Sequence, residues 1–220
     1  MKLLPHTNGL RLLLEYEEAT MLDQLVTQLA DLLSSHSSTA LDPDPLFASL
    51  EVGGSERLPE DPALARLFPN AYDEDDDSNE FRQVTEQGLL NRKLQDAMLV
   101  TSELGLGDGD DLAAPPIGVE ITPATLPAWV RTVTALRLAI AARIGLDSAD
   151  DHARLLEADD TRGTVLVFDW LAAILESVLA IMTAHGEATV EESDAGPGGA
   201  ADHGPESDTD EGSNQTRPPV

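Results

Sequence analysis

The stretches WVRTVTALRL (residues 129–138) and FDWLAAILESVL (residues 168–179) decide the fold of this chain, and each contains one of its two tryptophans. Both repeat apolar residues at the three- and four-residue spacing of one helix face. The first predicts a helix that is capped near Thr122 and stops at Gly145, because threonine favours the N-cap and glycine the position after the last turn. The second predicts a helix over residues 164–185 whose apolar face is wide enough to be mostly buried.

Similar patterns predict three more helices and two short strands. The predicted helices cover residues 15–35, 62–68 and 78–104, and the predicted strands cover residues 10–14 and 117–121. We expect the two strands to pair. The fold class is therefore mainly α, a helical bundle of about four to five helices with a small two-stranded β ribbon. The predicted inward stripe of the longest of these three helices consists of Phe81, Val84, Leu90, Leu94, Ala97, Met98 and Leu104.

Composition divides the chain into a folded body and a polar tail. We expect residues 1–185 to form a single helical domain, since a body of this size can bury about 70% of the surface that its unfolded chain exposes. Residues 186–220 contain nine acidic residues and one arginine. They hold too little apolar surface to offset the entropy of ordering them, so we predict a disordered acidic tail. The proline- and acid-rich residues 39–62 predict a loop.

The chain is strongly acidic, with 41 Asp and Glu against 13 Lys and Arg and a net charge of −28. The tail contributes −8 of this charge, which leaves −20 on the body. Such a field repels phosphate backbones, and binding by counterion release needs clusters of basic residues that are absent here. We therefore expect no direct binding to nucleic acid. The chain has no cysteine, which excludes disulfides, thiolate metal sites and thiol redox switches.

The sequence predicts no membrane span. The first residues lack the long apolar stretch of a signal peptide, and the most apolar run, residues 165–182, is interrupted by Asp169, Glu176 and Ser177. We therefore expect a cytoplasmic protein.

Patterns that suggest a metal or a cofactor are weak. Asp73, Asp75 and Asp77 match the start of an EF-hand calcium loop, but Ser78 replaces the glycine needed for the turn and Val84 stands where the bidentate glutamate belongs. A later glycine-rich linker follows a helix, whereas a dinucleotide fingerprint follows a strand. The five histidines are too scattered to form a ligand set. We expect neither a metal nor a cofactor.

The charged residues with the best case for a role inside the body are Asp169 and Glu176, which are seven residues apart and so share one helix face. They could meet arginines of other helices, and the candidates are Arg66, Arg137 and Arg143. One interpretation is a general acid/base pair in a helical hydrolase. The other is a set of interhelical salt bridges at the edge of the core. Because the sequence places no nucleophile, metal ligand or histidine beside the carboxylates, we favour the structural role and predict no catalytic residue.

Several motifs of this chain resemble those of one protein family. They are RLFPNAY at residues 66–72, EFR at 80–82, WVRTVTALRL at 129–138, RIG at 143–145, and DWL followed by LES within 169–177. Their order and spacing resemble an actinobacterial family of domains of unknown function that includes oxidative-stress regulators. This resemblance implies a helical, non-enzymatic cytoplasmic protein that influences transcription of stress-response genes through protein partners such as sigma factors. It carries over no catalytic residue.

The leading hypothesis for function is a regulatory module that binds a protein partner with a basic surface, because the acidic body would attract such a partner. It would act without a cysteine redox switch. The alternative from another class is a carboxylate-based ion-binding or hydrolytic helical domain built on Asp169 and Glu176. A third hypothesis is a homodimer that pairs through the wide apolar face of the last helix.

Overall fold

The structure is a computed structural model, and it describes residues 1–7, 9–36, 58–106 and 116–194. The chain divides into two compact units, Met1–Thr183 and Ala184–Val220. The predictions for residues 39–57 and for residues 195–220 of the tail lie outside the described residues.

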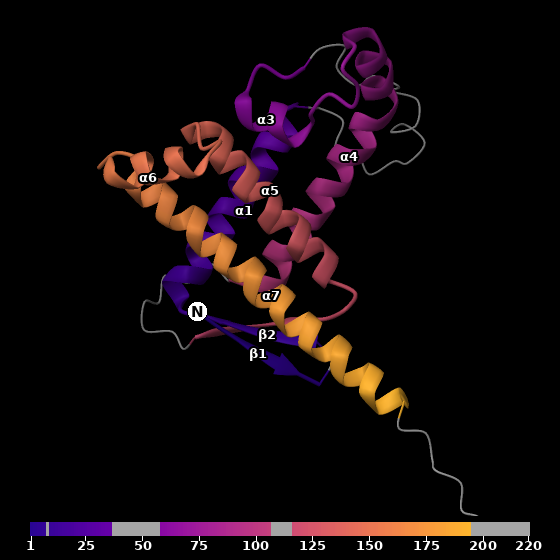
Figure 1. The fold of residues 1–220 in the computed structure, drawn as a ribbon, viewed down its shortest axis with the longest axis vertical. Helices are drawn as coiled ribbons and strands as arrows, with labels where there is room; N and C mark the ends of the chain where they lie inside the picture. The colour runs from indigo at the N-terminus through magenta and orange to yellow at the C-terminus, as the bar shows by residue number, and fades with distance from the viewer. Residues whose placement is uncertain (8, 37–57, 107–115, 195–220) are drawn as a thin grey trace, which may run out of the picture. The chain divides into compact units, whose positions relative to one another are not determined.

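The described part of the chain is mainly helical, as predicted (Figure 1). Its helices are α1 (Tyr16–His36), α3 (Pro62–Leu67), α4 (Asp75–Leu104), α5 (Leu126–Ile144), α6 (Ala149–Glu157) and α7 (Arg162–Asp194). Its strands are β1 (Lys2–His6), β2 (Gly9–Leu14) and β3 (Ile117–Ile121).

The predicted number of helices is too low because α6 falls in a stretch that the sequence analysis left without structure. This helix has nine residues, and Leu155 is its one fully buried side chain. Its N-terminus is capped by Ser148, whose side chain accepts a hydrogen bond from the backbone N–H of Asp151 at 3.2 Å. Its apolar residues Ala149, Ala153 and Leu156 recur at helical spacing, but over little more than two turns in an acidic stretch that otherwise resembles a linker.

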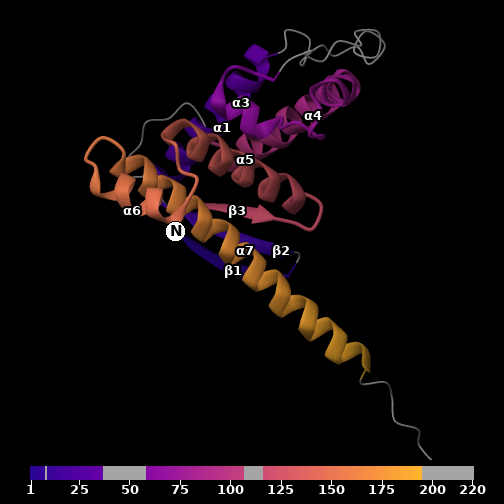
Figure 2. The same ribbon diagram turned by 45° about the horizontal axis from the view of Figure 1, so that its top comes forward.

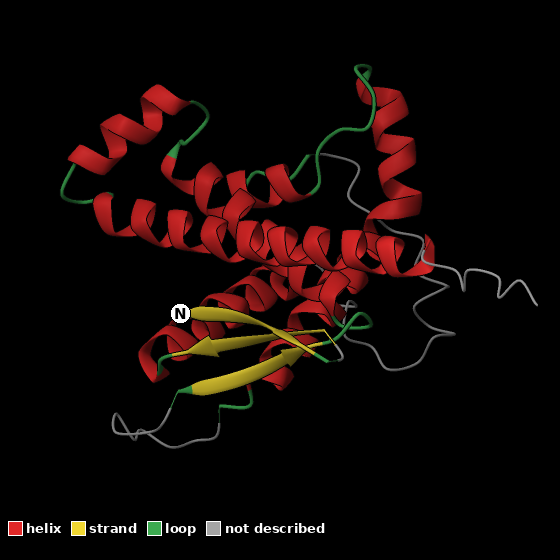
Figure 3. Cartoon of the chain, turned by 60° about the horizontal axis from the view of Figure 1, so that its bottom comes forward, coloured by secondary structure: helices red, strands yellow, loops and turns green. Residues whose placement is uncertain are grey.

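The three strands form an antiparallel sheet in the order β1-β2-β3 (Figure 3). The predicted pairing of β2 with β3 is present, with Leu12 opposite Val119. The predicted two-stranded ribbon is wrong in strand number, because β1 pairs with the other edge of β2 and places Pro5 opposite Leu10. Proline lacks the N–H that a central strand must donate, so it weakens a strand signal while remaining compatible with an edge strand such as β1.

The turn between β1 and β2 depends on Gly9, whose φ of 143° is a conformation that side chains of L-residues rarely adopt. A Cβ atom at this position would lie 2.2 Å from the backbone oxygen of Ile121. Glycine therefore allows the first strand pair to approach β3.

The main core forms where α1, α4 and α5 contact one another and cover one face of the sheet. Helix α1 buries one face at helical spacing, as predicted, and α5 ends at Gly145 in the left-handed conformation. The sheet contributes side chains from the alternate positions of β2 and β3. The sheet residues in this core are Leu10, Leu12, Leu14, Val119 and Ile121.

The inward face of α4 differs from the predicted stripe. Leu90, Leu94, Ala97 and Leu104 are buried as predicted, but three of the predicted core residues are exposed. They are Phe81 at 43%, Val84 at 72% and Met98 at 58% exposure. In the first half of the helix the buried positions are instead polar: Ser78, Arg82 and Glu86.

The two tryptophans have different environments. Trp129 is 2% exposed and donates from Nε1 to Oε2 of Glu103 at 2.5 Å, which ties α5 to the end of α4. Trp170, on α7, is half-buried, and its buried Nε1 forms no hydrogen bond to any described residue. The first tryptophan is thus an anchor of the core, whereas the second lies at its edge.

Helix α7 runs past α5 and the sheet (Figure 2). Its residues Leu171, Ile174 and Val178 join the core. The segment Arg162–Ile181 is long and apolar enough to cross a membrane by length and composition, and 22% of its most apolar window is buried within the protein. A core helix of a soluble protein passes the same test when it is mostly buried, whereas most of this window lies outside the core.

Candidate functional site

The predicted arginines of α3 and α5 lie where these two helices pack together. Arg66 forms an ion pair with Asp147, and Arg143 donates to Asp61 at 2.9 Å. The side chains of both arginines are about half exposed. Ion pairs in such positions contribute about 0–1 kcal/mol to stability, so they help to align the two helices without dominating the fold.

Arg137 takes a different position. Its guanidinium carbon lies 4.3 Å from the ring centroid of Phe168, an arrangement that favours a cation–π contact between α5 and α7. Its Nε is buried and hydrogen-bonded to no described residue. Arg66, Arg137 and Asp147 line one pocket of about 210 Å³, so the structure brings together two of the five predicted site residues.

The two predicted carboxylates of α7 do not share a site. Asp169 accepts hydrogen bonds from Nε2 of His152, on α6, at 2.9 and 3.1 Å. Glu176 is exposed, and within the described part of the chain no residue forms a hydrogen bond or ion pair with it. The expectation that no histidine lies near these carboxylates is wrong for Asp169, because α6 folds back beside α7 and brings His152 to it.

An interhelical ion pair of the predicted kind is formed by other residues. Arg131, on α5, donates from Nε and Nη2 to the two carboxylate oxygens of Asp96, on α4, at 2.7 and 2.8 Å. This hydrogen bond raises the pKa of Arg131 further above its usual value. The two parallel hydrogen bonds form a bidentate contact, which is the strong form of an arginine–carboxylate pair. The side chain of Asp96 is 9% exposed, so this contact between α4 and α5 is partly shielded from water.

A buried polar cluster that the sequence analysis did not predict lies at the start of α4. Arg82 donates from Nη1 to the backbone oxygen of Phe68 at 2.9 Å and from Nη2 to the side-chain oxygen of Asn70 at 2.7 Å. One turn later, Oε1 of Glu86 lies 2.5 Å from Nε2 of His36, the last residue of α1. The side chains of Arg82 and Glu86 are each 4% exposed. Together they fasten the turn after α3 and the end of α1 to α4.

This cluster is incompletely satisfied. Nε of Arg82 and Oε2 of Glu86 are buried and have no hydrogen-bond partner among the described residues. The shortest contact between the two charged groups is 3.9 Å, from Nη1 of Arg82 to Oε2 of Glu86. That distance gives electrostatic attraction but no hydrogen bond. A buried donor and a buried acceptor of this cluster therefore remain unsatisfied among the described residues.

Both side chains line a pocket of about 230 Å³ between the turn after α3 and the first half of α4. Much of the remaining lining is apolar. Its apolar lining residues are Leu67, Phe68, Pro69, Ala71, Phe81 and Leu89. Two signals in the sequence could have indicated this site. Ser78, Arg82 and Glu86 recur every four residues in phase with Leu90, and the motifs RLFPNAY and EFR supply Phe68, Asn70 and Arg82.

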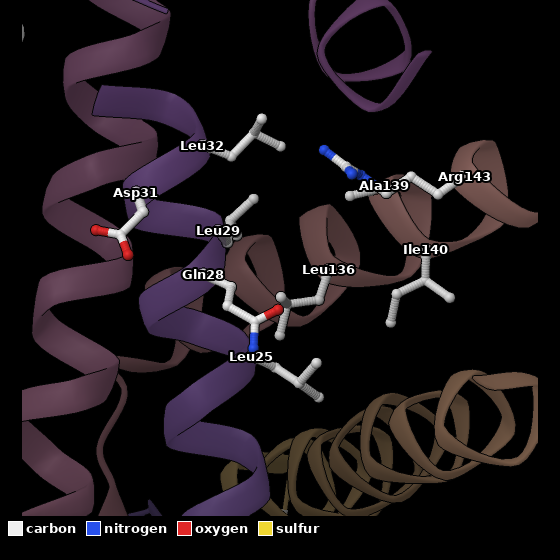
Figure 4. A pocket seen from close by; sticks show the side chains of 9 residues that line it. All are labelled: Leu25, Gln28, Leu29, Asp31, Leu32, Leu136, Ala139, Ile140 and Arg143. Atoms are coloured by element: carbon white, nitrogen blue, oxygen red, sulfur yellow. The ribbon is translucent and has the colours of Figure 1, made fainter. Parts of the chain in front are cut away.

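A second pocket, of about 340 Å³, lies between α1 and α5 (Figure 4). Its walls are mainly leucines and isoleucine, and the charged Asp31 and Arg143 stand at its edge. Arg143 of the predicted set thus lines this pocket. Among the described residues that line it, no buried polar side-chain atom lacks a hydrogen-bond partner. The pocket lined by Arg66 and Arg137 has one such atom, Nε of Arg137, whereas the pocket at the start of α4 has both a donor and an acceptor. The pocket at the start of α4 is therefore the better candidate for a specific site.

Within the described residues, no group of three or more His, Asp or Glu side chains could hold a metal ion. The fold and its polar clusters define a mainly helical protein with a small antiparallel sheet. Its long helix α4 buries polar side chains in its first half and mainly apolar side chains in its second half. The family described as "Domain of unknown function (DUF2017)" matches residues 3–182. The chain belongs to this family, and the resemblance drawn from its motifs is confirmed.

The chain is also similar to a curated protein. The chain is 30% identical over 173 residues to a protein of Mycobacterium leprae (strain TN) described as "Putative oxidative stress regulator AosR". The match covers 75% of this chain and 79% of the relative. No solved structure matches this chain.

Proposed function

We propose that this protein is a non-enzymatic cytoplasmic regulator that acts by binding another protein and thereby modulates stress-response transcription. The relative from Mycobacterium leprae supports the stress-related role, because its name describes an oxidative stress regulator. The absence of cysteine means that this chain would do so without a thiol switch. A sigma factor or another transcription component is the kind of partner that fits this role.

The charge of the chain supports a partner with a basic surface, and this observation carries the proposal. A net charge of −28 raises the association rate with a positively charged surface and repels acidic ones. Acidic side chains gather where α4 begins, and all of them are exposed. They are Asp73, Glu74, Asp76, Asp77 and Glu80.

An affinity purification at two salt concentrations tests this proposal. We expect the full-length protein to retain specific partners at about 50 mM salt and to lose most of them at about 500 mM, where the screening length falls to a few ångströms. Replacing Asp73, Asp76 and Asp77 by Asn should weaken this retention. A matched control replaces the exposed Asp150, Glu157 and Asp160 by their amides, which changes the net charge equally at α6. Partners that ignore salt, or no partners at low salt, would contradict the proposal.

A carboxylate-based site is the second candidate function, and the pair formed by His152 and Asp169 is the observation in its favour. A histidine oriented by a carboxylate is one part of a catalytic triad. No described hydroxyl group forms a hydrogen bond to His152, so the pair lacks a nucleophile. Calorimetric titration with calcium and magnesium tests the ion-binding version, because flat traces would remove it.

Self-association through α7 is a further property that we propose for testing. Leu166 is 55% exposed on this helix, within the long apolar segment Arg162–Ile181. A second copy covering this surface would bury it. Light scattering over a wide concentration range should then detect a dimer that Leu166→Lys weakens. A monomer at every concentration would dismiss this property.

A further inference from the structure

We infer that the pocket beside Arg82 and Glu86 binds one apolar side chain of a partner protein together with the neighbouring peptide group, flanked by Lys or Arg. This inference rests on the proposed function, which requires a protein partner, and it identifies the site and the chemistry of the contact.

The polar floor of the pocket supports a peptide group as the ligand. Nε of Arg82 is a buried donor and Oε2 of Glu86 a buried acceptor, and neither has a hydrogen-bond partner in the part of the chain that the structure describes. Leaving such groups unsatisfied costs about 1–3 kcal/mol each, so a ligand that supplies both partners is favoured. In an extended partner segment, the residue that follows the apolar anchor presents its N–H and its carbonyl oxygen on the same edge. A small rotation that brings Oε2 of Glu86 and Nε of Arg82 to the pocket surface would let that N–H donate to Glu86 and that carbonyl accept from Arg82.

Charge argues against an anion in this pocket. Glu86 lies beside Arg82 with a closest approach of 3.9 Å and already balances its charge. A carboxylate or phosphate would also have to pass the exposed acidic residues at the start of α4. A neutral polar group avoids both costs.

The size and lining of the pocket support an apolar side chain. Its volume of about 230 Å³ is below the roughly 300–1,000 Å³ of typical small-molecule sites. The rim of the pocket includes Phe81 and Leu89, which are 43% and 48% exposed. The ring of Tyr72 packs edge-on against that of Phe81, with the two ring centroids 5.7 Å apart. Aromatic and aliphatic anchors seated in pockets of this kind supply much of the binding energy of protein interfaces.

The exposed acidic residues beside the rim favour basic residues on either side of the partner's apolar anchor. Asp73, Asp76 and Asp77 lie at the N-terminal end of α4, next to Ser78, which lines the pocket. Lysine or arginine on either side of the apolar anchor would meet these carboxylates. This is the same charge complementarity that the proposed function requires of the whole partner surface.

The experiment titrates the full-length, ¹⁵N-labelled protein with the acetylated and amidated peptide Lys-Lys-Phe-Lys-Lys. We expect saturable binding with a Kd of about 1 mM, and chemical-shift changes concentrated at the residues that line the pocket. Two modified peptides test the two parts of the ligand. Replacing Phe by Ala, or methylating the peptide nitrogen that follows Phe, should weaken binding by about five-fold or more.

Two variants on the same helix locate the contact. Leu89→Ala removes a half-exposed residue of the rim and should weaken binding of the peptide by about five-fold. Val84→Ala is the matched control, because Val84 is 72% exposed and does not line the pocket. Binding to this control should equal binding to the unmodified protein.

A flat titration, equal binding of the Ala or the methylated peptide, or equal weakening by the two variants would overturn the inference. These outcomes are separable from the failure of the proposed function. A flat titration of the peptide combined with salt-sensitive partners in the affinity purification overturns the pocket and leaves the function standing. Peptide binding at the pocket combined with no partner at low salt supports the pocket and contradicts the function.

Discussion

The two halves of α4 bury side chains of different polarity. The buried side chains of the second half are mainly apolar, and those of the first half are polar or charged. The second half buries Leu90, Leu94 and Leu104 between α1, α5 and the sheet. The first half buries Arg82 and Glu86 against backbone and side-chain groups of α1 and of the turn after α3.

The difference separates what stabilises the fold from what remains available for binding. Burial of leucine in a packed core stabilises the native state by about 1.5–3 kcal/mol per side chain. Burial of a charged pair often stabilises no more than apolar residues of the same size would, because desolvation offsets the attraction. A pair that retains an unused donor and acceptor therefore points to a ligand more than to stability.

The largest effect is expected from breaking the charged pair in the polar half. Glu86→Leu leaves the charge of Arg82 buried without its carboxylate and should lower the free energy of unfolding by about 4 kcal/mol. Urea denaturation measures this loss. A loss below about 1 kcal/mol would mean that Arg82 relaxes into solvent.

A slightly smaller loss is expected in the apolar half. Leu94 is 2% exposed, and Leu94→Ala should lower the free energy of unfolding by about 3 kcal/mol through lost burial and the cavity left behind. Met98→Ala is the control, because Met98 is 58% exposed on the same helix. Equal losses for the two variants would show that the orientation of α4 differs from the one described.

The double variant Arg82→Met/Glu86→Leu tests whether the polar half is needed for stability. Removing both charges should recover about 2 kcal/mol of the loss caused by Glu86→Leu alone, because no uncompensated charge remains. The recovery is partial, since the backbone oxygen of Phe68 loses its donor. The same denaturation series measures it. A double variant less stable than Glu86→Leu would identify the pair as a structural requirement.

The smallest effect concerns Lys93, which lies in the second half of α4 between Leu90 and Leu94. Its Nζ lies 5.8 Å from the ring centroid of Phe68, and burial lowers its pKa, although the nearby Asp96 acts in the opposite direction. Between this lowered pKa and the ordinary lysine value, unfolding takes up a proton, so stability rises with pH in that window.

Lys93→Met should therefore raise the free energy of unfolding at neutral pH, by less than about 1 kcal/mol. The gain should shrink as the pH rises toward the ordinary lysine value. Denaturation midpoints at several pH values between about 7 and 10 measure this trend. A gain that grows with pH would contradict the direction of the shift.

The apolar half of α4 could be predicted from the sequence, and the polar half could not. Periodicity places Leu90 and Leu94 in the core correctly, because burial of leucine needs no particular partner. It also places Phe81 and Val84 in the core, where they are not. Burial of Arg82 depends on acceptors from a distant turn, and no pattern within α4 contains them.

The candidate site residues were likewise predicted only in part. Asp169 was predicted to have a polar partner, but the partner is a histidine of α6, a nine-residue helix that is too short for its apolar spacing to stand out. Strand β1 was missed because proline weakens the signal that its neighbours give. Interactions within one element could thus be predicted, whereas interactions between elements depended on geometry that the sequence pattern does not contain.

The most direct test of the proposed role of the polar half is the Nε–H resonance of Arg82 in the ¹⁵N spectrum of the full-length protein. In the free protein this proton is buried and has no acceptor among the described residues. Saturation with the peptide Lys-Lys-Phe-Lys-Lys should move the resonance downfield and slow its exchange with solvent, because the proton gains a carbonyl acceptor. A resonance that stays unchanged while the peptide binds would contradict the assignment of this pocket as the binding site.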